Sequence, residues 1–477
     1  MNPCMPLWEH IADGEPHVFK NPITGEERLY IYGTHDTSKT FYGSLDYTLW
    51  SAPINDLTDW KNHGVIWQVE RSGGKKEGES HLAALFAPDC CQGPDGNFYL
   101  FAFPIGAVSD KRNILVSDSP EGPFQPYGRI DYLGDPAVFV DEDSSVYVYN
   151  GGPGSETPTV SRLDKDMLTT LETREMKTME GDNIPNFFEA SSLRKVGEKY
   201  IYIYSSARKM DERYFTQTAQ GLTNGYALLE YCYSDNPMGP WKYGGVLLNN
   251  GGEPLGEPGD YYYGTRRSYY NGTIHGSIEK IDGKWYVFYH KNTNNSDFCR
   301  QTCMEPIQVK VLENGDVYIA EAEMTSQGYE DGGLPTNRIY PSGIACYLTN
   351  GAYITSGYEE KKEYNPIINI KNGAVAGIKY MDFGYGKTYR LEMELMPKNL
   401  GGRVAIRLDD PKTKPLAILD IPIEPKIILK NEDEKQEFQK IETNVSCISG
   451  KHAVYFSFYT ESEKEICEWN SFTFIEC

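Results

Sequence analysis

The sequence lacks the features that place a chain in a membrane or in a secretion pathway. No stretch approaches the roughly 18 consecutive apolar residues that a membrane span requires. The first residues, Met1 to Trp8, contain neither the basic region nor the apolar region of a secretory signal. We therefore expect a cytoplasmic protein with no membrane partner; a secreted chain whose signal has been removed is the alternative.

Positive charge is also scarce. The chain has 46 Lys and Arg against 68 Asp and Glu, which gives a formal net charge of -22. Because a nucleic-acid-binding surface is built from clustered Lys and Arg, we expect no nucleic-acid partner. The sequence gives no indication of the oligomeric state.

Cysteine is present, but not as a compact disulfide framework. The 10 Cys are scattered over 477 residues and include the adjacent pair Cys90 and Cys91. Disulfide scaffolds are short chains with closely spaced cysteines, so reduced thiols are the simpler interpretation here. This agrees with a cytoplasmic location.

An aromatic-rich alternating run occurs five times in the first two thirds of the chain, and turn sequences such as Asp282-Gly283 precede most of these runs. Such recurrence indicates a repeat architecture built from hairpins. The runs are Tyr30–Tyr32, Phe98–Phe101, Val146–Tyr149, Tyr200–Tyr204 and Trp285–Tyr289. Each is preceded by an acid or histidine beside a small residue or proline, and these five markers are Glu15, Asp89, Asp135, Glu189 and His275.

Further strand-like segments follow the aromatic runs, for example Leu49–Pro53 and Ile114–Asp118. Five four-stranded sheets around an axis would form a β-propeller, an architecture that protects sheet edges. If each marker begins the innermost strand of its blade, the five markers converge on one end of the central channel. Carboxylates gathered there shift one another's pKa values apart, which allows acid and base roles at one pH.

The pattern changes after about residue 340. Short alternating strands follow at regular spacing, as in a β-sandwich; they are Arg390–Leu395, Arg403–Leu408, Ala417–Ile421, Ala453–Phe458 and Phe472–Phe474. We therefore predict an all-β protein with a five-bladed propeller over residues 1–330 and a jelly-roll-like sandwich over residues 340–477.

At these residues the sequence resembles glycoside hydrolase family 43, whose members are five-bladed propellers that hydrolyse pentose or galactose linkages with inversion. The resemblance covers roughly residues 2–320. It rests on six segments in order, which are Glu15–Phe19, Tyr32–Asp36, Phe86–Asp89, Gly134–Phe139, Phe187–Ser192 and Gly272–Ser277.

The resemblance implies three carboxylate roles. Glu189 matches the general acid that protonates the glycosidic oxygen, and Asp135 matches the acid that orients it and keeps its pKa raised. The first-blade acid matches the general base that activates water on the opposite face of the sugar. Inversion places these base and acid carboxyls about 6.5 to 9.5 Å apart.

The first blade departs from the family pattern, which has Asp followed by Pro. Aligning the Pro-His-Val-Phe segment places Glu15 at the base position, and we favour Glu15 on this ground. Asp13 stands two positions earlier, and residues two apart on a strand share a face. Asp13 therefore remains the alternative base.

The remaining matches concern substrate and metal. His275 resembles the central histidine of the family, which helps to hold a cation or water near the sugar, and Arg300 resembles an arginine that binds the sugar. Asp89 is expected to contact sugar hydroxyls or support the ring, and His35 and Asp36 to border the pocket. No cofactor is required, although Ca²⁺ could bind through water near His275 or in the sandwich.

The C-terminal part resembles carbohydrate-binding module family 6, on segments that include Gly401–Asp409 and Trp469–Phe474. Glu468 stands where that family has a sugar-binding asparagine, while Trp469 and Tyr380 could form a stacking platform. We favour a structural sandwich that supports the propeller.

The expected function is an exo-acting, inverting glycosidase that releases terminal α-L-arabinofuranose or β-D-xylose from plant-derived oligosaccharides. Two alternatives remain open. One is a propeller that binds carbohydrate without cleaving it, and the other is a family 43 enzyme that acts on a galactoside.

Overall fold

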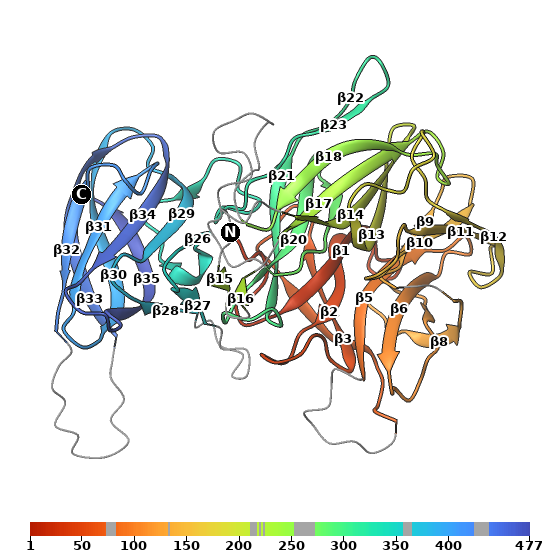
Figure 1. The fold of residues 1–477 in the computed structure, drawn as a ribbon, viewed down its shortest axis with the longest axis horizontal. Helices are drawn as coiled ribbons and strands as arrows, with labels where there is room; N and C mark the ends of the chain where they lie inside the picture. Colours follow the sequence, from red (N-terminus) through yellow and green to blue (C-terminus); the bar gives the residue numbers. More distant parts are fainter. Residues whose placement is uncertain are drawn as a thin grey trace.

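The structure is a computed structural model, and it describes residues 1–72, 83–131, 134–209, 217–218, 221–222, 225–251, 272–355, 365–423 and 438–477. It is built almost wholly from β-strands, in two domains that lie side by side in Figure 1. No helix in the described part of the chain has the length and apolarity needed to cross a membrane.

Five antiparallel sheets form the first domain, and the chain runs through each in order from the inside outwards. The innermost strands contact one another in sequence, and the last of them contacts the first, so the sheets close into a ring. The predicted five-bladed propeller followed by a β-sandwich is confirmed.

The first two blades consist of β1 (Ile11–Lys20), β2 (Glu27–His35), β3 (Asp46–Pro53), β4 (Lys61–Gln68), β5 (Ala83–Gln92), β6 (Phe98–Gly106), β7 (Ile114–Ser117) and β8 (Gln125–Gly128). The third and fourth blades consist of β9 (Ala137–Val140), β10 (Val146–Asn150), β11 (Thr159–Leu163), β12 (Thr170–Glu175), β13 (Phe187–Val196), β14 (Lys199–Lys209), β17 (Gly225–Ser234) and β18 (Lys242–Asn249). The fifth blade has β19 (Ser277–Ile281), β20 (Lys284–Asn292) and β21 (Arg300–Ile307). Two small hairpins, β15 (Gln217–Thr218) with β16 (Gly221–Leu222) and β22 (Val309–Val311) with β23 (Val317–Ile319), lie outside these sheets.

Each predicted aromatic run forms the second strand of a blade. These strands are buried on both faces between neighbouring blades, as the run of fully buried residues from Tyr30 to Tyr32 illustrates. Aromatic and β-branched side chains fill the wedge-shaped spaces between twisted sheets, which explains their enrichment at these positions.

The fifth blade has three strands rather than the predicted four, and the N-terminal segment lies along its open edge. The Cys4 N–H donates to the Thr302 carbonyl at 3.0 Å, and the Met304 N–H donates to Asn2 Oδ1 at 3.0 Å. The first residues of the chain therefore close the ring against its last blade.

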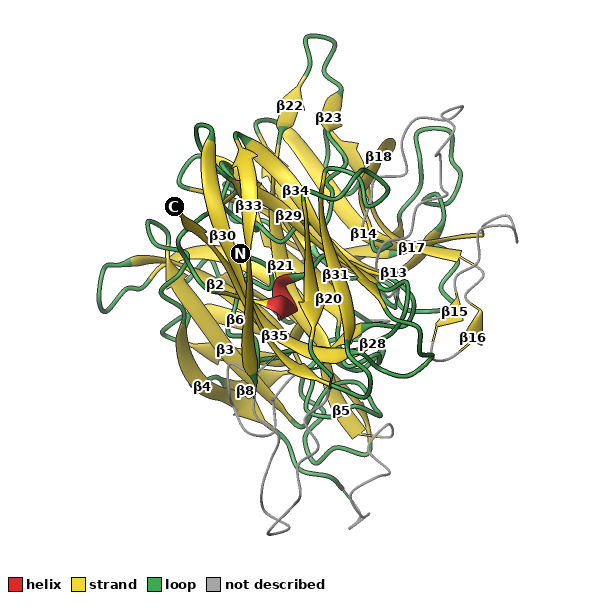
Figure 2. Ribbon diagram, turned by 90° about the vertical axis from the view of Figure 1, so that its left-hand side faces the viewer, coloured by secondary structure: helices red, strands yellow, loops and turns green. Residues whose placement is uncertain are grey.

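The second domain is a sandwich of two six-stranded sheets. One sheet contains β24 (Leu334–Pro335), β26 (Tyr347–Leu348), β29 (Val375–Asp382), β31 (Gly402–Leu408), β32 (Ala417–Ile421) and β34 (Lys451–Tyr459). The other contains β25 (Tyr340–Pro341), β27 (Tyr353–Ile354), β28 (Ile367–Ile370), β30 (Lys387–Pro397), β33 (Gln439–Ile448) and β35 (Cys467–Glu476). A short 3-10 helix, η3 (Ser342–Ile344), is drawn in red in Figure 2.

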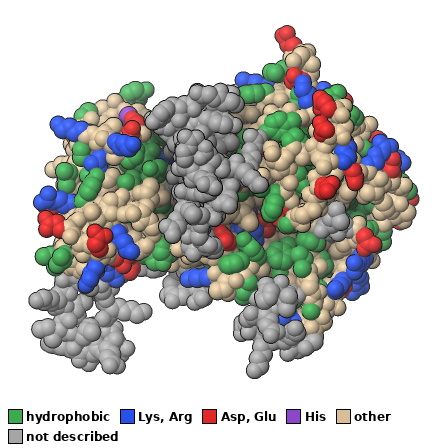
Figure 3. All heavy atoms as spheres, viewed as in Figure 1, with side chains coloured by type: hydrophobic (Ala, Val, Ile, Leu, Met, Phe, Trp, Pro, Cys, Tyr) green, Lys and Arg blue, Asp and Glu red, His purple; other side chains and the backbone are tan. Residues whose placement is uncertain are grey.

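On the face drawn in Figure 3, acidic, basic and hydrophobic side chains of the sandwich are interspersed. Its core is a single apolar cluster between the sheets, and Trp469 lies at its centre with no exposed surface. Because alternate residues of β30 point into this cluster, the predicted strand Arg390–Leu395 has the period of two expected for a sandwich.

Candidate active site

A bulge of the same kind interrupts the innermost strand of three blades near the mouth of the channel. In the first blade, Ala12 lies opposite Thr34 and Glu15 lies opposite Tyr32, so one extra residue is inserted. The second and fourth blades repeat this register between Phe86 and Asp89 and between Glu189 and Ser192. The bulged residue of each strand has a positive φ: 52° for Asp13, 24° for Ala87 and 69° for Ala190. Asp135 in the third blade also has a positive φ, of 41°.

These registers divide the five markers between different levels of the channel. Asp13 is the bulged residue of the first blade, two residues before Glu15, and Asp135 stands two residues before Ala137, the first residue of β9; we call this the upper level. Glu15 and Asp89 stand two residues further along their strands, level with Ser192, and we call this the lower level. The predicted equivalence is therefore wrong for Asp135 against Glu15 and Asp89. Aligning Glu15 with Asp135 on the proline that follows each of them ignores the inserted residue of the first-blade bulge.

Asp13 is the most strongly held carboxylate of the upper level. It is 6% exposed, accepts two bonds from Arg300 Nη1 at 2.8 and 3.0 Å, and accepts a third from Thr34 Oγ1 at 2.6 Å. Burial disfavours its charge, but Arg300 and two neighbouring histidines outweigh burial and lower the pKa of Asp13 to about 2. Asp13 is thus ionised at neutral pH.

Arg300 lies between two carboxylates. Besides Asp13, it donates to Asp36 from Nε at 2.8 Å and from Nη2 at 3.0 Å. The ring of Tyr42 covers the guanidinium with its centroid 4.7 Å away. Arg300 therefore joins the first and fifth blades through a paired charge network that is almost closed to solvent.

Asp135 and Glu189 lie close enough to Asp13 for its negative charge to act on both, and both remain partly exposed. Burial and the negative charge of Asp13 raise the pKa of Glu189 to about 7. Burial, Glu189 and Asp13 raise the pKa of Asp135 well above its usual range, although its carboxylate accepts a hydrogen bond from the Ala190 N–H. Asp135 and Glu189 are therefore a coupled pair that retains a proton near neutral pH.

Glu15 lies in the lower level and is 1% exposed. Its Oε2 atom accepts from Arg194 Nη2 at 3.1 Å and from Ser192 Oγ at 3.1 Å, and its Oε1 atom has no partner among the described residues. Burial raises the pKa of Glu15 to about 8 despite Arg194. Burial thus favours the protonated form of Glu15, and its carboxyl group is held by Arg194 and Ser192.

Asp89 links three blades from the lower level. It is bonded to His17 Nε2 at 2.6 Å and accepts from the N–H groups of Cys90 and Val138, both at 2.7 Å. It is 1% exposed. Asp89 supports the ring, which is one of the two predicted possibilities.

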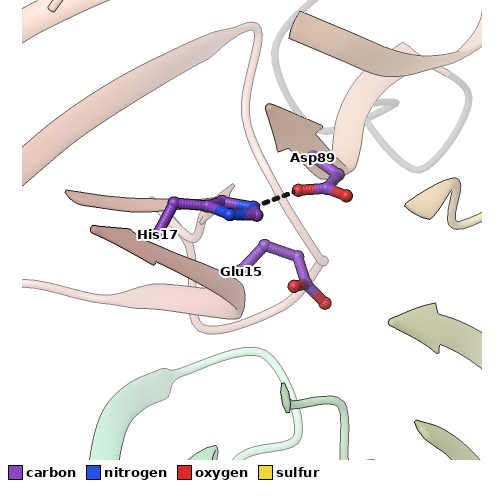
Figure 4. Close-up of side chains that lie close together, drawn as sticks. All are labelled: Glu15, His17 and Asp89. Atoms are coloured by element: carbon purple, nitrogen blue, oxygen red, sulfur yellow. Dashed lines mark hydrogen bonds and ion pairs between the residues drawn. The ribbon is translucent and has the colours of Figure 1, made fainter. Parts of the chain in front are cut away.

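Glu15, His17 and Asp89 form a cluster whose ligand atoms lie within 4.8 Å of one another (Figure 4). No other group of this kind occurs in the described residues. The cluster does not suit direct binding of Ca²⁺, which takes six to eight oxygen ligands. It offers two carboxylates, of which Glu15 is paired with Arg194 and Asp89 is bonded to His17.

Two histidines border Asp13. His275 is 5% exposed, its Nδ1 atom lies 3.8 Å from Asp13 Oδ1, and its Nε2 atom has no partner in the described part of the chain. Burial lowers its pKa. His290, which sequence reasoning missed, accepts from the Asp13 N–H through Nδ1 at 3.3 Å. Its only sequence sign is its place at the end of an aromatic strand.

The remaining predicted residues lie in the wall of the site. His35 is bonded to Asp46 at 2.6 Å and lies 3.4 Å from Glu9, and these carboxylates overcome burial and raise its pKa to about 10. Asp36 is 3% exposed and is occupied by Arg300. Two residues that sequence reasoning did not select, Tyr42 and Phe298, meet edge to face beside Arg300 with centroids 4.6 Å apart.

Trp469 and Tyr380, weighed above as a possible stacking platform, are engaged in other contacts. Trp469 is fully buried against Phe456, with ring centroids 4.5 Å apart. The Tyr380 hydroxyl donates to Glu323 at 2.7 Å, in the contact between the domains. Glu468 is paired with Lys398 at 3.1 Å. These aromatic residues serve packing within and between the domains.

Comparisons with known proteins agree with this architecture. Residues 23–311 match glycosyl hydrolases family 43, and residues 347–476 match the carbohydrate binding module of family 6. The first match begins after Asp13 and Glu15.

Two relatives match most of the chain. It is 35% identical over 431 residues to a xylosidase/arabinosidase of Thermoclostridium stercorarium, which covers 80% of this chain and 82% of that protein. It is 27% identical over 509 residues to an arabinoxylan arabinofuranohydrolase of Bacillus subtilis, which covers 94% of this chain and 90% of that protein. A crystal structure of a family 43 arabinoxylan arabinofuranohydrolase from Bacillus subtilis in complex with cellotetraose aligns with 100% of this chain and 97% of that chain, at 21% identity and a TM-score of 0.49.

The family match spans more than half of the chain, and the catalytic-domain fold, the carboxylate-lined channel and the first relative agree with it. The chain therefore belongs to glycosyl hydrolases family 43 and is a glycosidase.

Proposed function

We propose that the protein is an exo-acting, inverting glycosidase that removes terminal α-L-arabinofuranose or β-D-xylose from oligosaccharides derived from plant polysaccharides. The observation that carries the mechanism is the opposite ionisation of Asp13 and Glu189 at one channel mouth. The pentose specificity is supported by the names of two relatives, a xylosidase/arabinosidase and an arabinoxylan arabinofuranohydrolase.

Asp13 is the general base in this proposal, in place of Glu15. A base must be ionised and must reach a water molecule beside the sugar. Asp13 meets the first condition through Arg300, and it stands at the same level of the channel as Asp135, with a positive φ like that residue. Glu15 is protonated near neutral pH and is bonded to Arg194 in the lower level.

Glu189 is the general acid. Its pKa of about 7 lets it hold a proton at neutral pH and still release it to the glycosidic oxygen. The negative charge of Asp13 helps to keep that pKa raised, while Asp135 binds the peptide N–H that follows Glu189. The sugar would bind between Glu189 and Asp13, with the attacking water on the Asp13 side.

The other site residues are assigned by their contacts. Arg300 holds Asp13 rather than the sugar, because its guanidinium is engaged by Asp13 and Asp36. Tyr42 and Phe298 form an aromatic wall that the sugar ring can contact. No metal is required in this scheme; the unpartnered Nε2 atom of His275 suits a water molecule, or the hydration shell of a cation such as Ca²⁺.

We also infer that the protein works in the cytoplasm on short imported oligosaccharides. This is supported by its ten free thiols, eight of which are buried.

A panel of p-nitrophenyl glycosides tests the function. We expect hydrolysis of the α-L-arabinofuranoside or the β-D-xyloside in preference to the β-D-galactoside, with the inverted anomer visible first by proton NMR. Measurable sugar binding without turnover of any of these substrates would instead indicate a non-catalytic propeller. Preference for the galactoside would replace the pentose assignment and leave the catalytic residues unchanged.

A further inference from the structure

The hairpin between β20 and β21 connects the active site with the second domain. Its tip, residues 293–299, is closed by a bond of 2.8 Å from the Thr293 N–H to the Cys299 carbonyl. Asn292 at one end is the register partner of Arg300 at the other. Any displacement of the tip is therefore transmitted directly to Arg300.

On the propeller side, the hairpin tip contacts the wall of the site. Phe298 packs against Tyr42, and Ser296 Oγ donates to the Lys39 carbonyl at 2.9 Å. Arg300, which follows the tip, holds Asp13. The tip thus supplies part of the aromatic wall and leads into the residue that fixes the base.

On the opposite side, the hairpin is bonded to the sandwich domain. The Asn294 N–H donates to the Ile354 carbonyl at 2.7 Å, and Thr355 Oγ1 donates to Asn294 Oδ1 at 3.3 Å. Ile354 ends β27 and Thr355 follows it, and β27 lies on the side of the sandwich toward the propeller in Figure 1. The β27 segment of the sandwich therefore binds the hairpin tip.

Lys291, one residue before Asn292, makes the second connection. Its ammonium group donates to the carbonyls of Gly343 and Ala345 in and after η3, at 3.4 and 3.3 Å. Lys291 is only 2% exposed, and burial lowers its pKa. Lysine is rarely buried without a specific partner. Because the buried ammonium group of Lys291 donates to carbonyls of the sandwich, we infer that it holds the hairpin against that domain.

We propose that the sandwich domain is part of the active-site scaffold, and that Lys291, Asn294 and Thr355 are positioning residues that hold the hairpin so that Arg300 keeps Asp13 in place. This inference rests on the proposed role of Asp13 as the base. It gives the sandwich a catalytic contribution that requires no binding of sugar.

The chain offers a control at the same domain contact. Lys379 and Glu323 form an ion pair of 2.7 Å between the sandwich and the segment after β23. Glu323→Gln should weaken the contact between the domains without disturbing Arg300. It separates a loss of stability from a loss of positioning.

The test compares Lys291→Met and Thr355→Val with Glu323→Gln. Thr355→Ser keeps the hydroxyl and serves as the conservative variant of Thr355→Val. We expect Lys291→Met and Thr355→Val to lower kcat by about 10- to 100-fold, the range expected for a misplaced catalytic group. The acidic limb of their pH profiles should move to higher pH, since Arg300 then stabilises the Asp13 carboxylate less well. Glu323→Gln and Thr355→Ser should keep the wild-type kcat and pH profile, whatever their Tm.

Hydrogen exchange of the hairpin amides provides a readout that does not depend on the substrate. Faster exchange between Thr293 and Gln301 in Lys291→Met and Thr355→Val, but not in Glu323→Gln, supports the scaffold. If the wild-type protein hydrolyses no pentoside, the proposed function fails while this measurement still decides the scaffold. The inference is overturned if Lys291→Met and Thr355→Val keep the wild-type exchange rates, or keep the wild-type kcat and acidic limb in an active enzyme.

Discussion

Replacement of Asp13 by Asn is the substitution that most directly tests the assignment of the base. Asn has nearly the same shape and tolerates the positive φ of 52° at this position. The change removes the negative charge that Arg300 binds and the group that activates water. Two independent effects should follow, one on stability and one on catalysis.

The effect on stability can be worked from the pKa of Asp13. A fall from 3.8 to about 2 corresponds to roughly 2 kcal/mol, which the folded state gains when Asp13 is ionised. This stability is fully present above pH 4 and is lost as the pH falls toward 2. Asp13→Asn should therefore lower the free energy of unfolding by about 2 kcal/mol at neutral pH, with a smaller difference from wild type near pH 2.

The effect on catalysis should be a fall in kcat of about 10²- to 10⁴-fold, the usual contribution of a general base. The assay is release of p-nitrophenol from the preferred pentoside at saturating substrate. Asp13→Gly suits the same backbone and leaves space for azide, which should restore turnover by attacking the sugar in place of water.

Glu15→Gln is the matched control. Gln imitates the protonated form of Glu15, which predominates at neutral pH because burial raises its pKa to about 8. We expect a smaller loss of kcat than in Asp13→Asn and no rescue of Glu15→Gly by azide. A larger loss in Glu15→Gln, with azide rescue at position 15 alone, would refute our assignment and restore the prediction made from the sequence.

Four further outcomes can be checked with simple measurements. Glu189→Gln should reduce hydrolysis of natural oligosaccharides by at least about 10²-fold but spare aryl glycosides with strongly activated leaving groups. A loss that is equal for all leaving groups would contradict the acid role. Wild-type activity should fall as the pH rises through about 7, because Glu189 then loses its proton. Arg300→Lys should move the acidic limb of the kcat/KM profile to higher pH, since one ammonium group cannot replace the guanidinium that holds both Asp13 and Asp36. An unmoved limb would show that Arg300 does not set the charge of Asp13. Dialysis against EDTA should leave kcat and Tm unchanged, whereas a loss that Ca²⁺ restores would reveal a required cation. Trp469→Ala should lower the free energy of unfolding by about 3–5 kcal/mol in chemical denaturation, because it empties the sandwich core, while unchanged stability would place Trp469 outside a packed core.

The sequence by itself determined the architecture. Alternating aromatic runs such as Tyr30–Tyr32 predicted the second strand of every blade. The sandwich segments in which polar and apolar residues alternate also lie within observed strands. These patterns are local, since each strand must bury one or both faces whatever its neighbours are. Glu189 and Asp135 were also selected from short local motifs, and the fold brings them close enough to interact.

Only the tertiary structure decided which acid in the first blade faces that mouth. Asp13 and Glu15 are two residues apart, and the sequence alignment favoured Glu15 because it precedes a proline. The bulge inserts one residue and moves Glu15 to the lower level, where Arg194 binds it. Charge pairing also separates the pKa values of Asp13 and Glu15, because Arg300, which is 287 residues from Asp13 in the chain, favours the ionised form of Asp13. Neither the register of a bulged strand nor such a distant partner is encoded in a local pattern.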